Sequence, residues 1–282
     1  MKKLILILLV FSFSASAQKF ENISSIGNFS AASSFYITAN GYIYVCDEGK
    51  DELIMLDTLG NLYKTFGGYG WSDDSFDDPA DVFADPLTIY IADKNNHSIK
   101  RLDKNLNFLS SFTKKESNIS EEQFGYPSSV ATSNQGDLYL IDGENKRVIK
   151  FDIFGNFIQN FGGIDAGNYQ LSDPSQLAIS SANKIYVLDD KNIVVFDNFG
   201  NGIARLEFDN RLKSIRILFD VLIVTDISNN VYYSNLRSID GKIQRLEIDH
   251  NFEKRKIVSA LVLNGKLYLL SEKNILVFAN VN

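Results

Sequence analysis

The sequence predicts an all-β fold, a six-bladed β-propeller of four-stranded antiparallel blades. The first observation is a repeat: short apolar strands that end in an acid recur at intervals of 46, 49 and 47 residues, at Asp47, Asp93, Asp142 and Asp189. The second is that another apolar strand follows each of these and ends in a further acid, at Asp57, Asp103, Asp152 and Asp197. The third is length, because six units of about 44 residues, the size of a four-stranded blade, fill residues 18–282.

A tight turn is predicted after the second acid of each unit. In three units Gly-Asn follows this acid, as Gly60-Asn61 follows Asp57. An Asp that starts a turn can accept backbone N–H bonds, and Gly tolerates the positive φ that closes it, so each turn should lead into a third hairpin-connected strand. The second unit has Leu106-Asn107 instead, which predicts a looser hairpin there.

Prolines mark the predicted start of three blades, at Pro79, Pro127 and Pro174. Pro79 and Pro174 each lie thirteen residues beyond the Phe of a Phe-Gly-Gly sequence that ends an outer strand. Proline donates nothing to a strand ladder and suits the first residue of a strand. The segments that follow, residues 82–84, 130–132 and 177–179, are therefore predicted as innermost strands.

These features together resemble a known family. The Phe-Gly-Gly, the downstream proline, the apolar strand and turns such as the one from Asp93 to His97 are similar to the NHL repeat, most specifically over residues 60–200. The resemblance implies a propeller in which the turns between second and third strands share one face with the connections between blades. Long loops on a rigid scaffold are where recognition usually resides.

The N-terminal strand is predicted to close the ring. The chain ends four residues after Phe278, so the sixth unit lacks an outermost strand. Residues 19–27 match the pattern of residues 62–67, the outermost strand of the first unit, and lie in the right phase to replace it. We expect Phe20, Ile23 and Ile26 to become buried there, and closure to leave only short, protected strand edges.

Residues 1–17 have the pattern of a signal peptide. Lys2 and Lys3 precede an apolar run over residues 4–13, and Ala15-Ser16-Ala17 provides small residues for cleavage. The run is too short to span a membrane, so we expect a secreted or periplasmic protein without membrane insertion, with residues 18–282 as a single propeller domain. The single cysteine, Cys46, cannot form an internal disulfide and fits a buried strand position.

Charge argues against nucleic acid as a partner. The formal net charge is −7, whereas binding phosphates requires an excess of Lys and Arg. The densest basic stretch, residues 237–256, is interleaved with acids and is interpreted as a solvated surface. We expect a monomer.

Aromatic residues in the predicted connections favour a binding function. Tyr69 and Trp71 fall in one connection and Tyr169 in another, all on the predicted loop-bearing face. Tyr and Trp supply large contact areas at low entropic cost. With Asp73 and Asp74 beside them, they are the predicted binding residues for a protein, peptide or glycan partner.

A metal cofactor is not predicted, although Ca²⁺ remains open at one segment. Residues 73–78 carry four carboxylates, but without the spacing of a known calcium loop. NHL-like zinc enzymes use three histidines, whereas this chain has only His97 and His250, and neither is placed beside a nucleophile. No catalytic residues are assigned.

The alternative hypothesis is an enzyme. Lactonase-like propellers resemble this architecture and hold a divalent ion at the channel mouth with oxygen ligands. Asp81 and Gln176 lie two residues after a repeat proline, and Arg216 interrupts an apolar innermost segment, so all three are expected to face the channel. They would form the site of a metal-dependent lactonase or lyase-like hydrolase, or the polar lining that a water-filled channel requires.

Overall fold

The computed structural model describes residues 19–238, 241–248 and 256–280. The predicted signal peptide and His250 lie outside these residues. The described secondary structure consists of strands and one single-turn 3-10 helix, η1 (Gly167–Tyr169), as the all-β prediction requires. Within the described ranges, no helix is long and apolar enough to cross a membrane.

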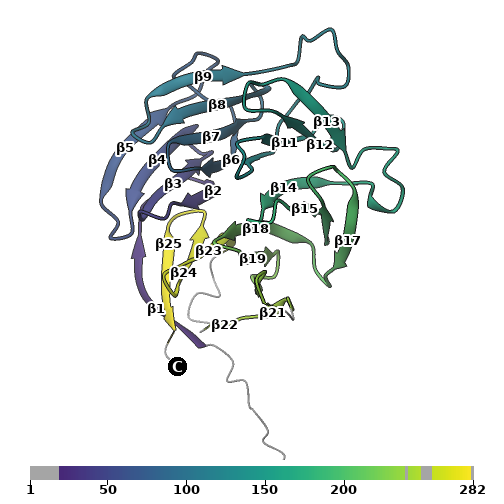
Figure 1. Cartoon of the computed structure of the whole chain (residues 1–282). Coiled ribbons are helices and arrows are strands. Elements are labelled where there is room, and N and C mark those ends of the chain that lie inside the picture. The colour runs from purple at the N-terminus through teal and green to yellow at the C-terminus, as the bar shows by residue number, and fades with distance from the viewer. Residues whose placement is uncertain (1–18, 239–240, 249–255, 281–282) are drawn as a thin grey trace, which may run out of the picture.

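Six sheets surround a central axis and form a six-bladed β-propeller (Figure 1). In the first four blades the strands run from axis to rim in chain order. The first blade comprises β2 (Ala32–Ile37), β3 (Tyr42–Asp47), β4 (Glu52–Asp57) and β5 (Leu62–Gly67). The second comprises β6 (Pro79–Ala84), β7 (Thr88–Asp93), β8 (Ser98–Asp103) and β9 (Phe108–Phe112). The third comprises β10 (Ser129–Thr132), β11 (Leu138–Asp142), β12 (Arg147–Phe151) and β13 (Phe157–Phe161).

The later blades keep the same plan, and the outermost strand of the fifth is short. The fourth comprises β14 (Pro174–Ile179), β15 (Ile185–Asp189), β16 (Asn192–Phe196) and β17 (Gly202–Glu207). The fifth comprises β18 (Leu212–Leu218), β19 (Val221–Asp226), β20 (Val231–Asn235) and the two-residue β21 (Gln244–Arg245). The sixth comprises β23 (Ile257–Leu263), β24 (Lys266–Ser271) and β25 (Ile275–Asn280), completed by β1 (Lys19–Ile26), with β22 (Glu247–Ile248) beyond it.

Closure by the N-terminal strand is confirmed. β1 pairs antiparallel with β25, from Phe20 opposite Asn280 to Ile26 opposite Ile275, and the two strands lie side by side in Figure 1. Phe20 and Ile26 are buried, but the expected burial of Ile23 is wrong, because its side chain is 52% exposed. A register shift between Asn22 and Ser24 falls at Ile23 and leaves it without a partner in the ladder.

The turn acids act as predicted, and the second blade departs from its prediction. Asp57 accepts the N–H groups of Leu59 and Asn61, each at 2.9 Å, and the Asn61 amide donates to its other oxygen. Asp103 makes the same bonds to Asn105 and Asn107, although Leu106 replaces Gly. Leu106 adopts a φ of 59°. It is buried in the core, so packing compensates for the strained backbone, and the hairpin is not looser.

The repeated acids at the ends of the second strands are fully buried and hold the connections between blades. Asp47 accepts the N–H groups of Ser30 and Ala31 at 2.6 Å. Asp93 accepts that of Asp77 at 2.9 Å, and Asp189 accepts those of Ser172 and Asp173. A buried carboxylate is tolerated where such charge-assisted bonds satisfy it. The repeat therefore fixes the loops that precede each innermost strand.

Candidate functional site

The topology defines two ends of the propeller. We call the end that carries the connections between blades and the turns between second and third strands the loop face. The turns between first and second strands, and between third and fourth strands, lie at the opposite end, the turn face. This follows from the antiparallel order of the strands within each blade.

The connection over residues 68–78, between β5 and β6, is held firmly on the loop face. Phe76 is fully buried and packs against Phe66, with ring centroids 5.6 Å apart. The buried Lys100 ammonium lies beneath the connection and donates to the carbonyl oxygens of Ser72, at 2.6 Å, and Ser75. Gly70 donates to the Phe76 carbonyl at 2.9 Å, which closes the loop on itself. The loop is therefore a rigid platform.

Two aromatic side chains project from this platform into solvent. Trp71 is 76% exposed and Tyr69 is 67% exposed. Their rings meet edge to face, with centroids 5.8 Å apart. Tyr169 does not join them: it is half-buried at η1, where its ring covers the bare backbone of Gly202 and contacts Phe196. Of the three predicted contact aromatics, the structure brings Tyr69 and Trp71 together and leaves Tyr169 packed against the fourth blade.

A hollow of about 330 Å³ lies beside Trp71. Its polar lining includes Asp73 from the same connection, and Asn95 and His97 from the turn between β7 and β8. A large aromatic surface next to carboxylate, amide and imidazole groups is the composition of a recognition site, in which apolar contact gives affinity and polar groups give orientation.

The acidic residues of this connection bond to different partners. Asp74 accepts the Ser72 hydroxyl at 2.6 Å, whereas Asp73 is exposed at the hollow. Asp77 accepts the Asn95 amide at 2.9 Å, and Asp78 pairs with Lys94 at 2.7 Å. No three metal-binding side chains converge anywhere in the part of the chain that the structure describes.

His97 joins this hollow to the next connection. Its backbone φ is 50°, its Nδ1 accepts the N–H of Tyr126 at 3.0 Å, and its ring centroid lies 4.3 Å from that of Tyr126. Burial, and then the positive charge of Lys115, lower the pKa of His97 below its usual 6.5, while Glu144 opposes the shift. The imidazole therefore stays neutral and remains an acceptor at neutral pH.

Acidification should weaken this contact. The pKa of His97 is lower in the folded protein than in the unfolded chain, so the unfolded chain takes up a proton first as the pH falls. The contribution of His97 to stability is therefore complete above pH 6.5 and is lost as the pH falls below that value. We expect the free energy of unfolding to fall less between about pH 7.5 and about pH 5.5 in His97→Asn than in the parent protein. Asn tolerates the positive φ and can accept the same N–H bond. Denaturant unfolding at both pH values checks this, and equal pH dependence in the two proteins would contradict it.

The predicted channel residues meet in one buried cluster. Asp81 Oδ1 lies 2.6 Å from Arg216 Nη2 and 3.0 Å from Gln176 Nε2. Ser34 donates to the same oxygen at 2.8 Å, and Ser129 donates to Oδ2 at 2.5 Å. All five side chains are buried. We call this group the axial cluster.

The axial cluster connects the blades to one another. Its members come from β2, β6, β10, β14 and β18, and backbone N–H groups of the neighbouring blade complete it: Val82 donates to Ser34 and Ile215 to Gln176. Both oxygens of Asp81 are engaged, so the enzyme hypothesis gains no support from this carboxylate. Ser34 and Ser129 were not among the predicted channel residues, although both occupy the register of Asp81, 47 and 48 residues away.

Comparison with known proteins supports the propeller repeat described above. The family model described as NHL repeat matches residues 124–151, which cover β10, β11 and β12 of the third blade. The third blade therefore matches an NHL repeat, and the described residues fold as a six-bladed β-propeller. The matched residues include Asp142 and Gly125. The Asp142 carboxylate accepts the N–H of Gly125 and so holds the connection before β10.

Curated relatives of this chain share only part of their length with it. Protein brain tumor of Drosophila melanogaster is 28% identical over 153 residues, which are 52% of this chain and 14% of the relative. Protein SUPPRESSOR OF QUENCHING 1, chloroplastic, of Arabidopsis thaliana is 23% identical over 189 residues, 55% of this chain and 18% of the relative. The chain thus spans less than a fifth of these relatives.

A solved structure matches nearly the whole propeller. A catalytically inactive variant of virginiamycin B lyase from Staphylococcus aureus, solved with quinupristin, superposes with a TM-score of 0.66 and covers 93% of this chain and 100% of the lyase. The sequence identity is 9%. The likeness therefore concerns the fold.

Proposed function

We propose that this NHL-repeat propeller is a secreted or periplasmic, non-catalytic binding protein that captures a protein, peptide or glycan partner on its loop face. One observation carries the proposal: Tyr69 and Trp71 are exposed side by side on a connection that Phe76 and Lys100 hold rigid. Exposed aromatics on a pre-organised loop lose little conformational entropy when a partner binds.

The surroundings of the aromatic pair support the same function. Asp73, Asn95 and His97 line the adjacent hollow and offer acceptors and donors beside the Trp71 ring. Binding hot spots combine such an aromatic anchor with nearby polar groups that fix orientation. The location outside the cytoplasm rests on the signal peptide predicted at residues 1–17.

Substitution of the aromatic pair tests the proposal. We expect Tyr69→Ala/Trp71→Ala to abolish retention of the partner by immobilised mature protein, exposed to an extract of its native envelope or medium. The melting temperature should change little, because both side chains are exposed. The matched control is Leu59→Ala/Phe154→Ala, which removes two equally exposed apolar side chains from the turn face and should retain the partner.

Trp71 also provides a direct readout. It is the only tryptophan of the chain, so its fluorescence reports on the loop face alone. We expect an eluted partner to shift or quench this emission upon rebinding. Retention that survives in the Tyr69→Ala/Trp71→Ala variant, with unchanged emission in the parent protein, would exclude this surface.

A further inference from the structure

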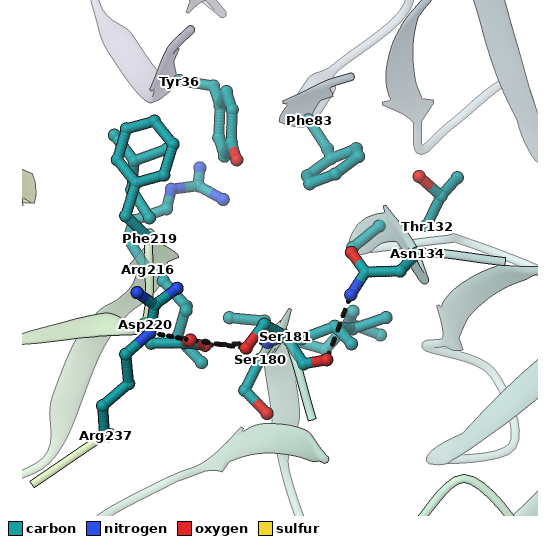
Figure 2. A pocket seen from close by; sticks show the side chains of 16 residues that line it. Tyr36, Phe83, Thr132, Asn134, Ser180, Ser181, Arg216, Phe219, Asp220 and Arg237 are labelled. Atoms are coloured by element: carbon teal, nitrogen blue, oxygen red, sulfur yellow. Dashed lines mark hydrogen bonds and ion pairs between the residues drawn. The ribbon is translucent and has the colours of Figure 1, made fainter. Parts of the chain in front are cut away.

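A second hollow opens at the other end of the molecule, where the central channel meets the turn face. Its volume is about 220 Å³, below the roughly 300–1,000 Å³ of sites for drug-sized ligands. Side chains from five blades line it, and Figure 2 shows them around one space. The loop-face aromatics Tyr69 and Trp71 are not among the lining residues. We call this hollow the axial cavity.

One wall of the axial cavity is aromatic. Tyr36 on β2 and Phe83 on β6 lie with ring centroids 5.0 Å apart and planes inclined at 58°. Both rings border the cavity in Figure 2, and the Tyr36 hydroxyl points into it. Such a wall favours a ligand with a flat face of C–H groups or an aromatic ring.

The Tyr36 hydroxyl has no hydrogen-bond partner among the described residues, although the side chain is only 8% exposed. Burial raises the pKa of Tyr36 to about 12, which Arg216 opposes and Asp85 reinforces, so the phenol keeps its proton at physiological pH. Because this hydroxyl faces the cavity and is not sealed from solvent, water or a ligand there can bond to it. The molecule thus holds an unused donor and acceptor inside a cavity.

Neutral polar side chains also line the axial cavity. Thr132, Asn134 and Ser180 contribute hydroxyl and amide groups, and Asn134 is oriented by donating to the Ser181 carbonyl at 3.0 Å. These groups can both donate and accept hydrogen bonds. A ligand seated against Tyr36 and Phe83 would therefore meet further hydrogen-bonding groups in the same lining.

Both guanidinium groups at the axial cavity are already paired with carboxylates. Arg216 lies 2.6 Å from Asp81, and Arg237 lies 2.7 Å from Asp220, which also accepts the Ser181 hydroxyl. The ion pair of Arg237 and the bond to Ser181 are drawn in Figure 2. The described lining therefore presents no uncompensated charge, and a charged ligand would lose hydration without gaining a counter-ion.

We propose that the axial cavity binds a neutral polyhydroxylated molecule of monosaccharide size. A pyranose has the two features that the walls require, a face of C–H groups for the rings of Tyr36 and Phe83 and an edge of hydroxyls for Tyr36, Thr132 and Asn134. The volume admits one such ring and excludes an extended chain from the interior. This site is independent of the loop face.

Calorimetry and saturation-transfer NMR with glucose, galactose and N-acetylglucosamine test the proposal on the mature protein. We expect at least one of these sugars to bind, and Tyr36→Phe to weaken it about tenfold, the effect of one lost hydrogen bond. Glucuronate should bind more weakly than glucose, because its carboxylate finds no free cation in the described lining. Tyr36→Phe should keep its melting temperature, since its hydroxyl bonds to none of the described residues.

Two further variants separate binding in the axial cavity from binding elsewhere on the molecule. Asn134→Ala should weaken the same sugar, whereas Phe154→Ala, a change on the turn face outside the axial cavity, should not. Trp71 emission should stay constant during the titration. The proposal fails if none of the three sugars binds at tens of millimolar, if Tyr36→Phe and Asn134→Ala bind as tightly as the parent, or if Trp71 emission follows the sugar.

Discussion

Replacement of Arg216 by Met should lower the free energy of unfolding by about 3–5 kcal/mol. The Arg216 side chain is 3% exposed and lies 2.6 Å from Asp81, which is also buried. Removing the cation leaves a carboxylate inside the channel with only neutral side-chain donors, Ser34, Ser129 and Gln176. Such a loss is a large part of a typical total stability of roughly 5–15 kcal/mol.

Two control variants isolate the cause. Arg237→Met removes the cation of a second Arg–Asp pair at the same cavity, but Arg237 is 68% exposed, so we expect a loss below about 1 kcal/mol. The double variant Asp81→Asn/Arg216→Met removes both buried charges and should recover much of the single-variant loss. Denaturant unfolding followed by circular dichroism measures all three. A loss in Arg216→Met no larger than that in Arg237→Met would show that the axial cluster is dispensable.

The architecture could be predicted from the sequence because a propeller repeats its local chemistry. Each buried acid such as Asp47 or Asp93 must receive backbone N–H groups from the connection before it, so the acid recurs at blade length. Closure by β1 could be predicted in the same way, because residues 19–27 have the pattern and the position of an outermost strand. The exposure of Ile23 could not be predicted, because it depends on a bulge that no residue pattern marks.

The sites were harder to predict, because exposure and convergence are properties of the folded chain. Tyr69 and Tyr169 both lie in connections, yet η1 turns Tyr169 onto Gly202, which has no side chain to resist it. Arg216 was expected at the channel, but nothing in the fifth unit shows that it reaches across to β6. Tyr36 belongs to an apolar strand and is typical of a core residue by sequence. Its hydroxyl is found to point into a cavity, without a bond to any described residue, only once the blades are in place.

Deletion of residues 18–27 should produce a protein that aggregates or melts far below the parent. The deletion removes β1, with which β22 pairs, and leaves the three inner strands of the sixth blade and the other five blades in place. It uncovers β25, whose backbone N–H and C=O groups would then form an exposed strand edge that can pair with other chains. The deletion also removes the buried side chains of Phe20 and Ile26, which pack into the core.

Point variants separate the loss of packing from the loss of the strand. Phe20→Ala and Ile26→Ala should each cost about 2–5 kcal/mol, because each leaves a cavity at a buried site. Ile23→Ala lies between them on the same strand but removes a side chain that is 52% exposed, and should cost less than about 0.5 kcal/mol. Size-exclusion chromatography and thermal melting compare the four proteins with the parent. A deletion variant that stays monomeric with an unchanged melting temperature would mean that the ring closes without β1. Equal losses in Phe20→Ala and Ile23→Ala would mean instead that β1 binds through its backbone alone.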